Sequence, residues 1–155
     1  MSANFYAALA ASIDSDGDRL VLETDDGRSF TRADLARESA RFARLMVDTG
    51  AVRGDRIAVQ VDKSPSNLFL YLGCLRAGLV YLPLNTAYQR GELSYFLENA
   101  QPKVVVCRPQ SFELMRGISA GHTRAFTLDE EGGGTLSDAA ATLPGEFETV
   151  DSAPD

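Results

Sequence analysis

The sequence predicts an α/β fold: a layered, mainly parallel sheet with helices on both faces. Mostly apolar runs of strand length at 57–61, 79–84, 103–107 and 124–128, of which 79–84 is continuous, alternate with segments of helical periodicity. Such runs are typical of parallel strands that are covered on both faces. The alternation of strand and helix predicts right-handed crossovers. With 155 residues, of which 45% are apolar and 24% charged, the chain is long enough for one domain with a real core.

Residues 4–12 are predicted to form a short helix that begins at Asn4. The apolar residues expected on one side of it are Phe5, Leu9 and Ile13. The acidic run at 14–18 resembles the start of a calcium loop, but its frame lacks the glutamate that closes such a loop. We therefore expect a solvated turn there and no metal site.

An Asp-Asp-Gly turn at 25–27 joins two short strand-like runs, which predicts a β-hairpin. Thr31 and Asp34 follow at the spacing of an approximate capping box. A helix from residue 32 to about 49 should then bury apolar residues at helical spacing: Leu35, Phe42, Leu45 and Met46.

Arg37, Arg41 and Arg44 form a basic stripe on another side of this helix. A basic stripe can hold phosphate, but it is more often a solvated face, and Glu38 beside Arg41 favours that interpretation. We therefore expect this stripe to face solvent.

The most apolar stretch runs from residue 64 to 85. Ser64 can cap a helix that is apolar on nearly every side, and such a helix must be enclosed by protein. Gly78 should close it in a left-handed conformation. The run at 79–84 is expected to be a strand covered on both faces, where the Tyr81 hydroxyl needs a partner.

The second half contains smaller elements. A helix over 92–100 and a short helix within 109–119 should flank the strand at 103–107. We place a domain boundary after the strand at 124–128, so that 1–128 forms the α/β unit. Residues 129–155 are interpreted as an acidic linker or ordered strap with a small helix over 136–143.

Charge and composition exclude several classes of function. The net charge of −7 comes from the tail, because residues 1–128 hold 15 basic and 14 acidic residues and 129–155 hold 8 acidic residues and no basic one. A nearly neutral body does not indicate binding to nucleic acid or to an anionic membrane. Without an apparent signal peptide or membrane span, we expect a cytoplasmic protein. In that compartment Cys74 and Cys107 are expected to be reduced core thiols, with a disulfide between them as the less favoured alternative.

No residue is predicted to be catalytic or to bind a metal. The single His122 has no ligand or triad partner within a recognisable motif. The triple glycine at 132–134 follows two glutamates and precedes no lysine, so it would repel a phosphate.

Two motifs carry a resemblance to a known family. The string Leu-Arg-Ala-Gly-Leu-Val-Tyr-Leu-Pro-Leu-Asn at 75–85 resembles the second core motif of the adenylate-forming ligases, which include acyl-CoA synthetases. The string at 30–35 resembles their first core motif, with Arg32 in place of the usual aromatic residue. Within that superfamily, residues up to 96 look most like malonyl-CoA synthetases, and the likeness covers about 11–107.

The resemblance implies an N-terminal subdomain whose partner is the remainder of the same ligase. Family members use ATP and magnesium to convert a carboxylate, here malonate or a relative, to an acyl-adenylate, and then transfer the acyl group to CoA. Their phosphate loop and catalytic groups lie beyond the region matched here, so this chain alone is expected to bind no cofactor and to be inactive. The residues that the motifs mark as structural are Thr31, Asp34, Gly78, Tyr81 and Pro83.

Asn85 and Thr86 are the weak candidates for a functional role. The segment after the second motif lies along the path of the CoA pantetheine in related enzymes, whereas the structural alternative is that both residues cap the next helix. A rival hypothesis for the whole chain is a stand-alone, non-catalytic module for interaction or small-ligand binding. A ligase fragment should instead expose an apolar packing face, through which it could dimerise.

Overall fold

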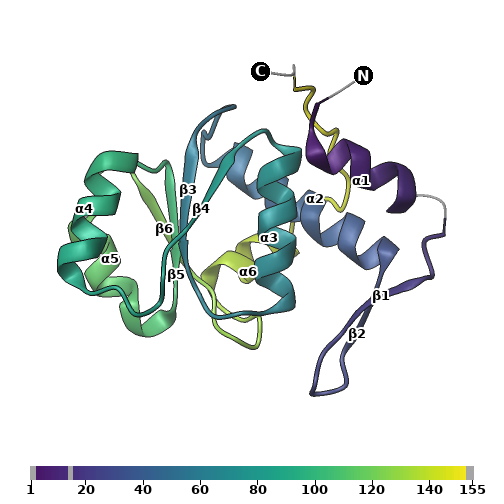
Figure 1. The fold of residues 1–155 in the computed structure, drawn as a ribbon, viewed down its shortest axis with the longest axis horizontal. Helices are drawn as coiled ribbons and strands as arrows, with labels where there is room; N and C mark the ends of the chain where they lie inside the picture. The colour runs from purple at the N-terminus through teal and green to yellow at the C-terminus, as the bar shows by residue number, and fades with distance from the viewer. Residues whose placement is uncertain (1–2, 14–15, 153–155) are drawn as a thin grey trace.

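A four-stranded, all-parallel sheet lies at the centre of the molecule (Figure 1). The computed structural model describes residues 3–13 and 16–152. The strands stand in the order β4-β3-β5-β6. They are β3 (Arg56–Gln60), β4 (Val80–Pro83), β5 (Val104–Cys107) and β6 (Arg124–Thr127). The predicted layered α/β fold is confirmed.

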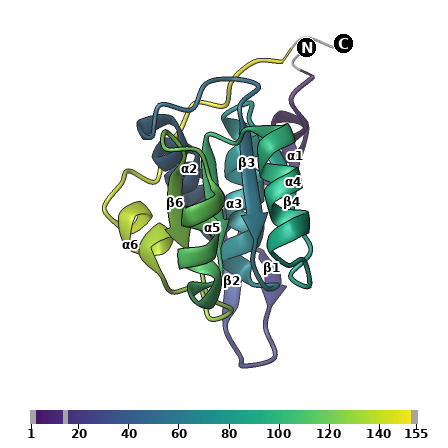
Figure 2. The same cartoon turned by 90° about the vertical axis from the view of Figure 1, so that its left-hand side faces the viewer.

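Helices cover both faces of the sheet (Figure 2). The larger layer consists of α2 (Arg32–Asp48), α3 (Pro65–Arg76) and α6 (Thr135–Ala141). The opposite face carries α4 (Arg90–Ala100) and α5 (Phe112–Ile118), the latter preceded by a 3₁₀ turn, η1 (Pro109–Ser111). The N-terminal elements lie outside the larger layer: α1 (Phe5–Ile13) and the hairpin of β1 (Leu20–Glu23) and β2 (Ser29–Thr31).

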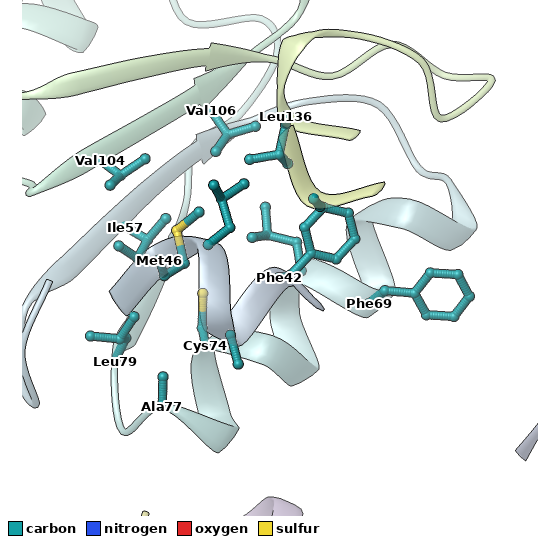
Figure 3. Packing of buried hydrophobic residues seen from close by; sticks show 14 of the residues in the cluster. Phe42, Met46, Ile57, Phe69, Cys74, Ala77, Leu79, Val104, Val106 and Leu136 are labelled. Atoms are coloured by element: carbon teal, nitrogen blue, oxygen red, sulfur yellow. The ribbon is translucent and has the colours of Figure 1, made fainter. Parts of the chain in front are cut away.

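The side chains of β5 divide the core into two clusters. Val104 and Val106 point into the larger layer, which Figure 3 shows, whereas Val105 and Cys107 point toward α4 and α5. The α2–α3 contact is close because a Cβ atom on Gly73 would lie only 2.9 Å from backbone atoms of α2. Cys74 and Cys107 are free, buried thiols in different clusters, on opposite faces of the sheet.

Local chemistry sets the ends of α2 and α3 as predicted. The Thr31 hydroxyl accepts the Asp34 N–H at 3.2 Å, and the Asp34 carboxylate accepts the Thr31 N–H at 2.8 Å, which completes the capping box. That Thr31 N–H bond is the main reason why the pKa of Asp34 is lowered. Gly78 has φ of 68°, and the Leu79 N–H reaches back to the Cys74 carbonyl at 2.8 Å to close α3.

Two predictions for residues 64–85 are wrong. Helix α3 is not enclosed on every side, because Leu68 and Tyr71 remain 37% and 36% exposed. Strand β4 is not fully covered, because Val80 is 46% exposed and none of its four residues is fully buried, and it forms an edge of the sheet that pairs only with β3. Within the described part of the chain, no element packs over these positions to complete their burial.

The buried side of α1 also differs from the prediction. Tyr6 is the buried residue, at 3% exposure, whereas Phe5 is exposed. Asn4 caps the helix as expected, since its side-chain oxygen accepts the Tyr6 N–H at 2.9 Å. The side chain of Ile13 and the first two residues of the acidic turn at 14–18 lie outside the described residues.

The basic stripe on α2 is only partly solvated. Arg37 is half exposed and pairs with two acidic side chains on its own helix. Arg41 pairs with Glu38 at 3.1 Å but also donates to the Leu143 carbonyl at 3.2 Å, and the Arg44 guanidinium lies 5.5 Å from the centre of the Phe147 ring. The expectation of a solvated face is therefore wrong for these two arginines, because residues 143–152, which we call the strap, run across them.

Arg76 joins the strap to the helical layer, a role that sequence reasoning missed. Its guanidinium donates to the Ala36 carbonyl at 2.7 Å and to the Phe147 carbonyl at 2.5 Å, and lies 4.6 Å from the Tyr6 ring centre. The Val150 N–H in turn donates to the Arg76 carbonyl at 2.9 Å. The Ala3 N–H donates to the Ser152 carbonyl at 2.8 Å, so that both ends of the described chain lie side by side (Figure 1).

Candidate functional site at the carboxyl edge of the sheet

The carboxyl edge of the sheet is where this topology places a crevice. Strands β3 and β5 are neighbours, but the helices that follow them, α3 and α5, pack on opposite faces. In open α/β sheets, ligands bind outside the carboxyl ends of the strands at such a switch point. The segments that leave β3, β4 and β5 at this edge therefore form the candidate site.

Asn85 and Thr86 leave β4 at this edge, and side chains of the neighbouring strands hold their backbone. The Gln60 amide donates from Nε2 to the Asn85 carbonyl at 2.9 Å and to the Tyr88 carbonyl at 3.4 Å. Arg108 donates from Nη2 to the Thr86 carbonyl at 3.0 Å. The position of the Asn85–Thr86 segment is thus fixed by β3 and β5 as well as by its own strand.

The structural alternative required Asn85 and Thr86 to cap the next helix, and their side chains do not do so. Helix α4 begins only at Arg90, and the Glu92 carboxylate accepts the Gln89 N–H at 2.9 Å. The Asn85 side-chain oxygen accepts the Ala87 N–H at 2.9 Å, which stabilises the turn itself. No hydrogen bond to the described residues uses the Asn85 amide nitrogen or the Thr86 hydroxyl.

Sequence reasoning missed Gln60 and Arg108. Gln60 is 1% exposed, and within the described chain its Oε1 atom and the Nε atom of Arg108 are buried without a partner. Asp62 lies 3.8 Å from Arg108 and partly balances its charge. The available signal was a glutamine at the end of a buried strand, since a buried amide must satisfy its hydrogen bonds somewhere.

Among the described residues at this edge, Cys107 and Tyr81 are not activated as nucleophiles. Burial raises the pKa of Cys107 to about 12, against a smaller opposing effect of Arg108, so that its sulfur is a neutral thiol near pH 7. Burial also raises the pKa of Tyr81 to about 12, although its hydroxyl donates to the Asn67 side chain at 2.7 Å. These groups are held in their neutral forms and contribute packing and hydrogen bonds.

Gly78 and Pro83, the remaining motif residues, lie where they shape the backbone and its packing. A Cβ atom on Gly78 would lie 2.8 Å from the Val150 side chain, so glycine lets the strap pass close to the end of α3. Pro83 stands on the edge strand β4. Since the Leu84 N–H points to the Val59 carbonyl of β3, the ring of Pro83 occupies the opposite, outer edge.

The glycine-rich turn at 132–134 does not fit the phosphates of ATP. At the glycine-rich turn, the Asp129 carboxylate accepts the N–H groups of Glu131 and Gly133 at 2.9 and 2.8 Å. The turn thus directs its donors to its own carboxylate, which would repel a phosphate. Over 3–13 and 16–152 there is no group of three or more His, Cys, Asp or Glu side chains that could hold a metal ion.

Comparison with known proteins assigns the family. The model of the family described as AMP-binding enzyme matches residues 9–151, which is most of the chain. The chain belongs to this family. The crotonobetaine/carnitine–CoA ligases of Salmonella paratyphi A and Citrobacter koseri are 30% and 29% identical over 115 and 101 residues, or 73% and 64% of this chain. Those segments are 22% and 20% of the two ligases.

Two solved structures share the fold of this chain. ATP-bound MatB from Rhodopseudomonas palustris superposes with a TM-score of 0.95 at 42% identity, over 99% of this chain and 30% of that one. The anthranilate CoA ligase AuaEII, in complex with anthranoyl-AMP, superposes over 97% of this chain and 29% of its own with a TM-score of 0.84 at 18% identity, which shows the fold alone. The chain therefore spans less than a third of the length of these relatives.

In the described part of this chain, no helix has the length and apolar character needed to cross a membrane.

Proposed function

We propose that this chain is the N-terminal part of an ATP-dependent acyl-CoA synthetase. The whole enzyme would convert a carboxylate, ATP and CoA to acyl-CoA, AMP and pyrophosphate through an acyl-adenylate, in the cytoplasm. The agreement with MatB carries this proposal, because it extends over 99% of this chain but only 30% of MatB. The rival hypothesis of a stand-alone module has no observation that favours it.

The finer proposal is a malonyl-CoA-type synthetase that acts on malonate or a relative. The 42% identity to MatB, against 30% to a crotonobetaine/carnitine–CoA ligase, supports it. The side chains that select the acid would belong to the rest of the enzyme. ATP and magnesium would bind there as well.

Within that enzyme, this part serves as scaffold, and Asn85 and Thr86 are the only residues that we assign to a ligand. We propose that they line the route of the CoA pantetheine. Their place at the switch-point edge and the unused donors on both side chains support this role. Pantetheine carries amide groups, which such donors can bind.

The test is the activity of the longer ligase with malonate, ATP, magnesium and CoA. Thr86→Val should raise KM for CoA by about fivefold, the equivalent of one hydrogen bond, and leave malonate-dependent ATP–pyrophosphate exchange unchanged. Thr142→Val, which removes an exposed hydroxyl at the end of α6, serves as the matched control. An unchanged KM for CoA in Thr86→Val would contradict the pantetheine route, and a natural stop codon after Asp155 would contradict the fragment proposal.

A further inference from the structure

A hollow on the outer side of α3 is lined by both apolar and polar residues. We call it the α3–β4 groove and define it by its lining: Lys63, Ser64, Asn67, Leu68, Tyr71 and Tyr81. The rings of Tyr71 and Tyr81 meet edge to face at 5.3 Å. A second hollow shares three of these residues and reaches the β1–β2 hairpin at Leu22, so the depression continues along the molecule.

Helix α3 has more apolar residues than the described chain buries. Phe69, Leu70 and Leu72 fill the core on the inner side, while Leu68 and Tyr71 face the groove at 37% and 36% exposure. A single exposed apolar residue needs no explanation, but a helix that is apolar around its circumference is normally enclosed. Here the uncovered residues are adjacent and line one hollow, which is typical of an interaction surface.

The edge of the sheet beside the groove limits what can cover it. The Val80 and Leu84 N–H groups are bonded to β3, so Tyr81 and Pro83 present their backbone to the open side. Pro83 has no N–H, which disfavours the addition of another strand along this edge. The groove is therefore suited to side chains of a helix or loop that pack against α3.

We propose that the α3–β4 groove is the docking surface for the part of the same ligase that this chain lacks, an inference that rests on the proposed function. The missing part is large, since this chain spans 30% of MatB and 22% of a ligase from Salmonella paratyphi A. The docking segment is apolar, with an acidic group opposite Lys63, whose ammonium makes no ion pair with the described residues. A second copy of this chain fits poorly, because a two-fold interface would set one hollow and one Lys63 against another.

Tyrosine labelling with tetranitromethane tests the docking surface in the two forms of the protein. Tyr71 should be nitrated in the 155-residue chain and about tenfold more slowly in the longer ligase, where the packed core of an interface excludes reagent and water. Tyr95, which is 64% exposed on α4 beyond the opposite face of the sheet, is the internal reference for reagent activity in the 155-residue chain.

Equal rates of Tyr71 nitration in the longer ligase and in this chain would overturn the proposal and leave the ligase assignment intact. Protection of Tyr71 in the 155-residue chain that grows with its concentration, together with a dimeric mass, would also overturn it, in favour of a second copy. A reading frame that ends at Asp155 would instead remove the proposed function, and the docking surface with it.

Discussion

Strands β4 and β5 are both apolar runs of four residues, yet the chain treats them differently. All four residues of β5 are buried, whereas β4 has exposed residues at both ends, and Val80 is 46% exposed. Strand β5 lies between two strands and two helical layers, while β4 has one neighbour and an open side. The comparison teaches that an apolar run does not by itself say whether a strand is covered: the described chain buries all of β5 and leaves β4 partly exposed.

A charge placed in each strand should give the largest difference. Val105→Asp puts an unpaired carboxylate at a fully buried position of β5 and should cost about 4 kcal/mol or more, enough to unfold much of the chain. Val80→Asp, at the exposed start of β4, should cost less than about 1 kcal/mol. Urea unfolding of both variants measures this, and equal losses would contradict the assignment of β4 as an open edge.

The buried arginine should matter next. Arg76→Ala removes the guanidinium that donates to the carbonyls of Ala36 and Phe147, and it should destabilise the chain by about 3 kcal/mol. The exposed Arg116→Ala is the matched control, with an expected change of less than about 0.5 kcal/mol. Hydrogen exchange at the Val150 amide should accelerate in Arg76→Ala; unchanged exchange there would show that Arg76 does not hold the strap.

Two helical glycines extend the comparison to packing. Gly73→Ala would place a methyl group 2.9 Å from the α2 backbone and should cost about 2 kcal/mol through overpacking. Gly91→Ala in α4 meets no atom within 4 Å and should instead stabilise the chain by up to about 1 kcal/mol, because alanine is the better helix former. Thermal unfolding distinguishes them, and a stabilising Gly73→Ala would disprove the close α2–α3 contact.

The smallest expected effect concerns the start of α2. Asp34→Asn weakens the capping box and should cost about 1 kcal/mol near neutral pH. Because the folded-state pKa of Asp34 is lowered, the stabilisation is complete above the unfolded-state pKa and is lost as the pH falls through the folded value, below 3.8. The difference between the two proteins should therefore be constant near neutrality and shrink in acid, and a difference that grows in acid would contradict the shift.

The sequence predicted features that depend on neighbours along the chain, and missed those that depend on distant ones. Thr31 and Gly78 follow from capping chemistry within a few residues. The hydrogen bond from Arg76 to the Phe147 carbonyl joins positions 71 residues apart, and nothing in the local pattern around either residue indicates it. The open side of β4 was missed because an apolar run looks the same whether its cover lies in this chain or in another part of the protein.

The candidate site shows the same division. The family motif drew attention to Asn85 and Thr86, and strand order alone places their segment at the carboxyl edge. Gln60 lies at the end of β3 and Arg108 directly follows β5, and only the structure shows that both hold this segment. What the two side chains bind is decided by the ligase kinetics proposed above.

The most direct test of the central claim is the change in unfolding temperature caused by Leu68→Asp in two contexts. In the 155-residue chain the substitution faces solvent near the start of α3, where an acidic residue is favourable, so the temperature should shift by less than about 2 °C. In the longer ligase the same carboxylate would enter a covered groove, and we expect a decrease several times larger. An equally small shift in both proteins would contradict the claim that the exposed apolar residues of this chain are covered by the rest of the enzyme.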